Sequence, residues 1–404
     1  MSGPLTGLRI FDMTRILAGP TATQVLADLG ADVIKVERPG SGDDVRHWGP
    51  PFLKDKEGAD TAESVYFNAA NRNKRSITLN LAHPEGQALA KRLIAECDVL
   101  FENYKVGDLA KYGLAYDQIK DPFPSLIYCS LTGFGQTGPY APRAGFDLVV
   151  QAMGGIMSIT GSEGGEPAKV GVGIADIMTG MYCNIAILAA LRHRDATGEG
   201  QQIDMSLLDC QVAWLVNEGM NYLYTGNVPK PWGTAHATIV PYQAFPTNDG
   251  RFILGVGNDR QFQRFCEFAG APELAEDPRF LTNSVRVQNR PACVEAVSDL
   301  TKKHPTAHWL EGLPPLGVPV GPLNSIDQVF ADPQVQQRGM RIELDHPAVG
   351  GKTPYIASPI KMSATPPEYR RAAPMVGEHS AEVLGELLGM DEAAVAALRA
   401  DGVV

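Results

Sequence analysis

The chain has 404 residues, of which 44% are hydrophobic and 20% charged, so it is long enough for two domains and has the composition of a globular protein. Its 46 acidic and 35 basic side chains give a net charge of −11, and the sequence contains no block of basic residues. Both features disfavour nucleic acid or an anionic membrane as a partner. An anionic ligand would therefore require lysines and arginines gathered locally.

Strands alternate with helices along the first third of the chain. Apolar periodicity predicts strands at 8–13, 33–36, 76–79, 99–101 and 125–130, and helices at 21–29 and 84–97. This alternation is typical of an α/β fold with a mostly parallel sheet. Ligands of such sheets bind at the carboxyl ends of the strands, so the segments after each strand are the ones to search for chemistry.

The remainder divides into a helical stretch, a smaller α+β domain and a returning tail. Helices are predicted at 176–194, 206–224, 260–268, 294–300, 308–313 and from 380, and strands at 242–245, 252–256, 340–344 and 360–362. Asn248-Asp249-Gly250 is a turn signal that predicts a hairpin. We expect residues 1–205 in the large domain, 206–227 in a linker helix, 228–330 in the small domain, and 331–404 in the large domain again.

The chain carries no sign of secretion or membrane insertion. Its six cysteines form no CxxC pair, and the longest uncharged apolar stretch, 177–191, is shorter than the roughly 20 residues of a membrane span. We therefore expect a cytoplasmic protein with reduced thiols.

Basic residues near strand ends suggest a phosphate site. The first strand–helix turn lacks the GxGxxG fingerprint, since Gly19 stands alone before Pro20, which disfavours a redox dinucleotide. Arg38 follows the second strand, where its planar guanidinium suits phosphate oxygens, although a surface salt bridge is an equal alternative. Together with Arg38, the basic residues near strand ends predict a polyphosphate site: Arg72, Lys74, Arg75, Lys105 and Lys111.

Asp176 follows the glycine-rich segment 171–173 and begins a long apolar helix. One interpretation is an N-cap, which stabilises a helix by about 1 kcal/mol. The other is a nucleophile on a thioester, kept ionised by the positive end of the helix, with nearby backbone N–H groups stabilising oxyanions. No HxH, HExxH or GxSxG motif occurs, which disfavours a metal or serine hydrolase and predicts no metal.

Several segments occur in one order that resembles the family III coenzyme A transferases, the group of formyl-CoA transferase, carnitine CoA-transferase and 2-methylacyl-CoA racemase. They are GLRIFDMTRILAGPTATQVLADLGADVIKVERPGSGDDVR, NRNKRSITLNL, ENYKVGDLAKYGL, LTGFGQTGPY and GVGIADIMTGMY. The segment WGTAHATIVPYQAF, followed by DGRFILGVGN, resembles most closely the branch that acts between succinyl-CoA and glutarate or hydroxymethylglutarate.

The resemblance implies a Rossmann-like large domain built from both chain ends, a small α+β domain and an interlocked homodimer. It implies coenzyme A as the acyl carrier, no metal, Asp176 as nucleophile and Arg38 at the phosphate–ribose end of the coenzyme. Further residues fall on the family's coenzyme-binding segments: Ile16, Leu17, Ala70, Asn73, Lys74, Asn103, Tyr104, Lys105, Lys111, Thr132, Gly133 and Phe134.

The resemblance leaves the reaction partly open. Family racemases have His where this chain has Phe146, and the glycine run of formyl-CoA transferase is replaced by Gly233-Thr-Ala-His236. We expect CoA transfer from succinyl-CoA to glutarate or a related dicarboxylate, with Arg46, Arg143 and His236 as candidate anchors for the acceptor. Alternatives are α-proton exchange of the racemase type, a formyl-CoA:oxalate or carnitine-type transferase, and a non-catalytic acyl-CoA-binding protein.

Overall fold

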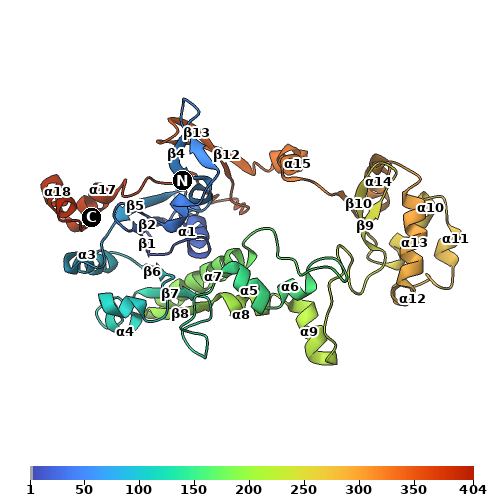
Figure 1. Cartoon of the computed structure of the whole chain (residues 1–404), viewed down its shortest axis with the longest axis horizontal. Coiled ribbons are helices and arrows are strands. Elements are labelled where there is room, and N and C mark those ends of the chain that lie inside the picture. The colour runs from blue at the N-terminus through green and yellow to red at the C-terminus, as the bar shows by residue number, and fades with distance from the viewer. Residues whose placement is uncertain (1–2) are drawn as a thin grey trace. The chain divides into compact units, whose positions relative to one another are not determined.

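A computed structural model describes residues 3–404, which form two compact units (Figure 1). The larger unit contains the chain up to Met157, Lys169–Asn227 and Gln336–Val404, and the smaller contains Ser158–Ala168 and Val228–Val335. The segment 158–168, which the predicted limits assign to the large domain, thus belongs to the smaller unit.

A six-stranded parallel sheet forms the centre of the larger unit, as the alternating pattern predicts. The strands are β1 (Arg9–Asp12), β2 (Asp32–Glu37), β5 (Lys74–Thr78), β6 (Val99–Glu102), β7 (Ile127–Thr132) and β8 (Gln201–Ser206). Their order is β5-β2-β1-β6-β7-β8, and all neighbours pair in parallel. From β1 the chain continues to β2 and β5 on one side, and from β6 it continues to β7 and β8 on the other side. The point at which the strand order reverses, the switch point of the sheet, therefore lies between β1 and β6. β8 was not among the predicted strands.

Helices cover both faces of this sheet because apolar side chains alternate along its buried strands. Ile10 packs with α1 (Ala18–Asp28) and α7 (Ile174–Thr197), whereas the next residue, Phe11, packs with α3 (Pro84–Ala95), α17 (Ser380–Leu388) and α18 (Glu392–Ala400). The C-terminal helices therefore complete the core of the unit that the N-terminus begins.

α7 has the length and the apolar composition of a membrane-spanning helix. The shorter uncharged stretch 177–191 within it did not indicate this. Half of its most apolar window is buried, and the helix packs on α1, so it is a core helix. A Cβ at Gly180 would lie 2.6 Å from the carbonyl oxygen of Ala18. Only glycine therefore permits this close approach of α7 to α1.

The single helix predicted at 206–224 is two helices, α8 (Leu207–Ala213) and α9 (Val216–Thr225). The break is at Val216, whose φ of 39° is left-handed and rarely adopted by a β-branched residue. The predicted strand at 340–344 is β12 (Arg341–His346), paired with β13 (Gly351–Ile356). The strand predicted at 360–362 is wrong, because that segment has no regular structure.

Short elements complete the larger unit. They are η1 (Asp44–His47), β3 (Phe52–Lys54), β4 (Asp60–Ser64), α2 (Val65–Ala69), η2 (Asp108–Tyr112), α4 (Tyr116–Ile119), α5 (Asp147–Met153) and α6 (Ile156–Ile159), the last crossing into the smaller unit.

The smaller unit has a three-stranded antiparallel sheet beside helices. Its strands are β9 (Tyr242–Pro246), β10 (Arg251–Gly255) and β11 (Val320–Pro322), and the predicted hairpin is β9–β10. Its helices are α10 (Asp259–Phe268), α11 (Glu273–Glu276), α12 (Asn283–Gln288), α13 (Arg290–Thr301), α14 (Thr306–Gly312), η3 (Pro314–Leu316) and α15 (Ile326–Ala331), with α16 (Pro333–Gln337) at its edge. Trp309 is fully buried in its core against Phe252 and Phe265.

Candidate active site

Two cavities lie beside the switch point of the larger unit, where the turns after β1 and β6 meet. The first measures about 450 Å³ and the second about 280 Å³. Arg15, Tyr104 and Asp108 line both of them. The cavities are therefore neighbours that share a wall, and together they offer an elongated ligand a continuous set of contacts.

The first cavity gathers cations in an otherwise acidic chain. Arg38, Lys111 and Arg15 line it, and the side chain of Arg38 is 55% exposed. Arg38 and Arg15 both pair with the carboxylate of Asp44, Arg15 at 3.1 Å. The planar guanidinium groups are thus held in place but remain near the surface, as binding of a phosphate group requires.

The second cavity contains Asp176. Its wall is formed by the turn between β1 and α1, the segment after β6, the end of β7, and residues 143–146. Asn103 fastens two of these parts together, because its Oδ1 accepts a bond from Arg15 N at 2.9 Å and its Nδ2 donates to Arg15 O at 2.8 Å. A Cβ at Gly133 would lie 2.5 Å from the Cα of Gly145, so glycine is needed where these two segments of the wall approach each other.

Asp176 is the third residue of α7, not its N-cap, which is Gly173. The N-cap interpretation is therefore wrong. The capping acceptor comes from α5 instead, since Asp147 Oδ1 accepts a bond from Ala175 N at 2.9 Å. Ile174 N donates to Val172 O at 2.8 Å. The N–H groups of these two residues are thus engaged within the protein and are not free to stabilise an oxyanion.

The carboxyl of Asp176 has a perturbed pKa. Burial is the larger cause and the negative charge of Asp147 the smaller one, and together they raise it to about 7. The sequence-based expectation that the helix end simply keeps this carboxylate ionised is therefore wrong near neutral pH. A carboxyl that titrates near pH 7 inside a cavity is typical of a functional group.

Most of the predicted site residues line the two cavities. The second cavity brings together Asp176, Ile16, Leu17, Asn103, Tyr104, Lys105, Thr132, Gly133 and Arg143. The first contains Arg38, Tyr104 and Lys111. Among residues 3–404, the lining of these cavities does not include Ala70, Asn73, Lys74, Phe134 or Arg46.

The prediction that the basic cluster before the third strand binds phosphate is wrong for Arg72 and Lys74. Both are buried, Arg72 just before β5 and Lys74 as its first residue. Lys74 Nζ donates to Asn71 Oδ1 at 2.8 Å and lies 3.3 Å from Asp12 Oδ2, and burial lowers its pKa to about 7. Arg72 is paired with Asp28.

Other members of the predicted set also have interior partners. Asn73 Nδ2 donates to Asp28 Oδ1 at 2.8 Å, and Arg75 pairs with Asp32. Ala70 is buried, and Phe134 is buried against the edge of the Tyr140 ring. None of these residues lines either cavity among those that the structure describes.

Arg46 is not available as a substrate anchor. Its guanidinium donates 2.8 Å bonds to Glu37 and Glu63 and lies 3.5 Å above the ring of Phe67. The whole side chain is buried by these contacts. Its charge is therefore satisfied inside the protein.

Arg143 does line the cavity of Asp176 and lies 4.0 Å above the Tyr140 ring. His236 belongs to the smaller unit, where its Nδ1 accepts a bond from Thr238 N at 3.1 Å. Its role as an anchor stays a prediction.

Several charged residues that line or adjoin the cavities were not predicted, among them Arg15, Asp108 and Asp147. Arg15 and Asp108 line both cavities, and Asp147 lies behind Asp176. Arg15 stands in the first strand–helix turn and could have been selected by the rule that ligands bind there. In the part of the chain that the structure describes, no group of three or more His, Cys, Asp or Glu side chains is arranged to hold a metal ion.

Comparison with known proteins gives matches over nearly the full length. The model of CoA-transferase family III matches residues 5–380. The succinate–glutarate CoA-transferase of Agrobacterium fabrum is 51% identical over 384 residues, covering 95% of this chain and 96% of that protein. The human succinyl-CoA:glutarate CoA-transferase is 45% identical, covering 99% and 90%. The crystal structure of a CAIB/BAIF family protein from Brucella suis has a TM-score of 0.84 at 49% identity, covering 96% of this chain and 100% of that one.

Proposed function

We propose that this chain, which belongs to CoA-transferase family III, moves coenzyme A from succinyl-CoA to glutarate or a related dicarboxylate. Family membership makes it a CoA-transferase that acts on CoA thioesters and carboxylates. The observation that carries the proposal is Asp176, a carboxyl group with a raised pKa in a cavity that shares a wall with the one lined by Arg38 and Lys111.

Asp176 acts as the nucleophile. A carboxylate oxygen of Asp176 attacks the thioester carbon, and the C–S bond breaks to leave a mixed aspartyl anhydride and the CoA thiolate. The thiolate then attacks the aspartyl carbonyl carbon, which releases succinate and forms an aspartyl-CoA thioester. The acceptor carboxylate attacks that thioester, forming a second anhydride and releasing the thiolate again. The thiolate finally attacks the acceptor's acyl carbon, which yields the new acyl-CoA and restores Asp176.

Two features of the cavity suit this sequence. The anhydrides hydrolyse readily, so the half-buried position of Asp176 limits access by water. The raised pKa makes the carboxylate more basic than an exposed one, and therefore a stronger nucleophile in its ionised form.

Coenzyme A binds along both cavities. Its phosphates contact Arg38, with Lys111 nearby, and its thiol arm passes Arg15 and Tyr104 toward Asp176. The support is the shared wall of the cavities and the exposed guanidinium of Arg38 in the first of them. Arg143 holds the second carboxylate of the acceptor, since it lines the cavity of Asp176 and its guanidinium carries no carboxylate partner among the ion pairs of the described residues.

The large unit is Rossmann-like in this proposal, supported by its parallel strand order, which reverses at the cavities. The chain acts as an interlocked homodimer. Large apolar side chains exposed on α5, α7 and α9 support a partner surface: Leu148, Val149, Ile185, Leu188, Met220, Leu223 and Tyr224. Light scattering at micromolar protein would give twice the 43.4 kDa chain mass, and a monomer would refute this part.

The decisive experiment compares the wild type with Asp176→Asn. Succinyl-CoA and a panel of acids are incubated with each, and new thioesters are separated. We expect glutaryl-CoA from the wild type, none from Asp176→Asn, and trapping of the acyl-aspartate by hydroxylamine in the wild type alone. CoA binding by both variants is the control for folding. Unchanged transfer by Asp176→Asn would refute the mechanism.

The same reaction in deuterated water tests the alternative activity. A racemase introduces deuterium at the α-carbon of a 2-methylacyl-CoA, whereas a transferase moves CoA between acids without such exchange. Phe146, 57% exposed beside the cavity, has no proton to exchange. We therefore expect no α-deuterium with any acyl-CoA that serves as donor.

A further inference from the structure

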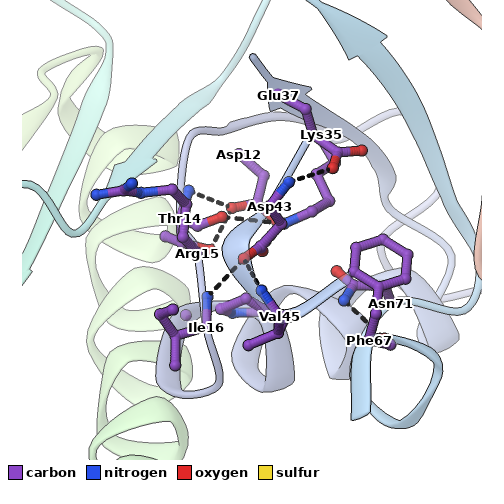
Figure 2. A network of polar contacts seen from close by, with 12 residues as sticks. Asp12, Thr14, Arg15, Ile16, Lys35, Glu37, Asp43, Val45, Phe67 and Asn71 are labelled. Carbon is purple, nitrogen blue, oxygen red and sulfur yellow. Dashed lines mark hydrogen bonds and ion pairs between the residues drawn. The ribbon is translucent and has the colours of Figure 1, made fainter. Parts of the chain in front are cut away.

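The turn between β1 and α1 is held by side chains at three consecutive backbone N–H groups. Thr14 N donates to Asp12 Oδ1 at 2.9 Å, and Ile16 N donates to Asp43 Oδ1 at 3.2 Å. Arg15 N between them donates to Asn103, as described above. This arrangement fixes the backbone of a turn that lines both cavities (Figure 2).

Ile16 adopts a left-handed backbone conformation, with φ at 72°. For a β-branched residue this region is strained by about 1–3 kcal/mol, and it persists only where the surroundings enforce it. Ile16 lies in the wall of the cavity that contains Asp176. The strain is thus located at the candidate active site, and the bond from Ile16 N to Asp43 is one of the contacts that enforce it.

Asp43 and Lys35 form a fully buried ion pair next to this turn. Asp43 Oδ2 accepts a bond from Lys35 Nζ at 2.8 Å, and both side chains have no exposed surface. Lys35 Nζ also donates to Thr14 O at 3.0 Å. The pair therefore contacts the turn at two points, a carbonyl oxygen through Lys35 and an N–H group through Asp43 (Figure 2).

The same aspartate is connected to the wall of the cationic cavity. Asp43 caps η1 through a bond from Val45 N, and its own N–H donates to Glu37 Oε2 at 2.8 Å. The next residue, Asp44, pairs with Arg15 and Arg38. One buried carboxylate thus joins the segment that carries Arg38 to the turn that faces Asp176.

We propose that Lys35 and Asp43 are positioning residues for CoA transfer, which set the turn at Ile16 and so the geometry of the thioester against Asp176. This inference rests on the proposed function. Stability alone does not account for the pair, because buried ion pairs are commonly no more stable than apolar side chains of similar volume. The geometric role of the pair does account for it, because two apolar side chains would provide neither the acceptor for Ile16 N nor the donor for Thr14 O.

The central test is the double variant Lys35→Met/Asp43→Leu, which replaces both charges by apolar groups of similar size. We expect a melting temperature lower by a few degrees, because Ile16 N and Thr14 O lose their partners. We also expect faster hydrogen exchange of the Ile16 amide and a kcat lower by about ten- to hundredfold, as a misplacement near 1 Å produces. KM for succinyl-CoA should change by less than about threefold, because the phosphate contacts remain. A wild-type kcat, or a reduced kcat with a protected Ile16 amide, would overturn the proposal.

Single variants keep the test valid if the double variant fails to fold. Asp43→Asn retains an acceptor oxygen for Ile16 N, whereas Asp43→Ala does not, so Asp43→Asn should keep the higher kcat. Equal kcat values for the two would contradict the inference. The matched control is Asp28→Asn, which removes a buried carboxylate paired with Arg72 away from the turn. It should lower the melting temperature without changing the exchange of Ile16.

The proposed function and this inference fail in different ways. A wild-type enzyme without transfer activity would refute the function, yet the exchange rate of Ile16 in the Asp43 variants would still report whether this pair holds the turn. A fully active wild type with unaffected Asp43 variants would refute the positioning role alone.

Discussion

Replacing Asp176 by asparagine should make the protein more stable, in contrast to most substitutions of a half-buried residue. Burial raises the pKa of Asp176 from 3.8 to about 7, so ionising this group in the folded protein costs ~4 kcal/mol at 1.36 kcal/mol per pKa unit. Between these two values the unfolded chain has lost a proton that the folded protein retains. Stability therefore falls as the pH rises from about 4 to about 7 and is level above that.

Asp176→Asn removes this cost because an amide does not ionise. The gain over the wild type should be about 1 kcal/mol at pH 4.5 and about 4 kcal/mol at pH 8. With an unfolding entropy of ~2.1 cal/mol/K per residue, the gain at pH 8 raises the melting temperature by ~5 °C for 404 residues. Melting curves of both proteins at the two pH values provide the measurement. A gain that is absent, or that does not grow with pH, would refute the argument that Asp176 is destabilised by burial.

Three further outcomes follow from the same site. The rate of transfer should rise with pH through a midpoint near 7, because in the proposed mechanism only ionised Asp176 attacks. Asp147→Asn should move that midpoint to lower pH in a kcat–pH profile, and an unmoved midpoint would exclude Asp147 as a cause of the raised pKa of Asp176. Gly180→Val should lower stability by about 1–3 kcal/mol, because its Cβ would lie 2.6 Å from Ala18 O, and urea unfolding would measure this. Arg38→Ala should weaken CoA binding by about ten- to hundredfold in calorimetry, the effect of losing one charge-assisted hydrogen bond, while an unchanged affinity would remove Arg38 from the phosphate site.

Strand position predicted the site well wherever a segment follows a strand. Tyr104 and Arg38 line cavities because the carboxyl ends of parallel strands share one edge of the sheet. The same reasoning fails at Lys74, which is the first residue of β5 and whose ammonium is held inside the protein by Asn71 and Asp12. Nearness to a strand in sequence does not suffice, and the end of the strand has to be specified.

Pairing between distant residues could not be predicted. The charge of Arg46 looked available because its partners, Glu37 and Glu63, are 9 and 17 residues away and belong to separate strands. The capping of α7 is similar, since the acceptor Asp147 is 28 residues from Ala175. The apolar periodicity of the sequence predicts α7, whereas the contact of Asp147 with its first turn comes from a distant part of the chain.

The carboxylate of Asp44, shared by Arg15 and Arg38, determines what kind of inhibitor this site would accept. The two arginines share one carboxylate, which is tethered to the protein, 42% exposed, and offsets one of their two charges. An uncharged mimic of the coenzyme would leave this arrangement intact and gain little from either guanidinium. A dianionic group can displace Asp44 into solvent and take both arginines, so affinity at this end of the cavity should depend on the charge of the inhibitor more than on its shape.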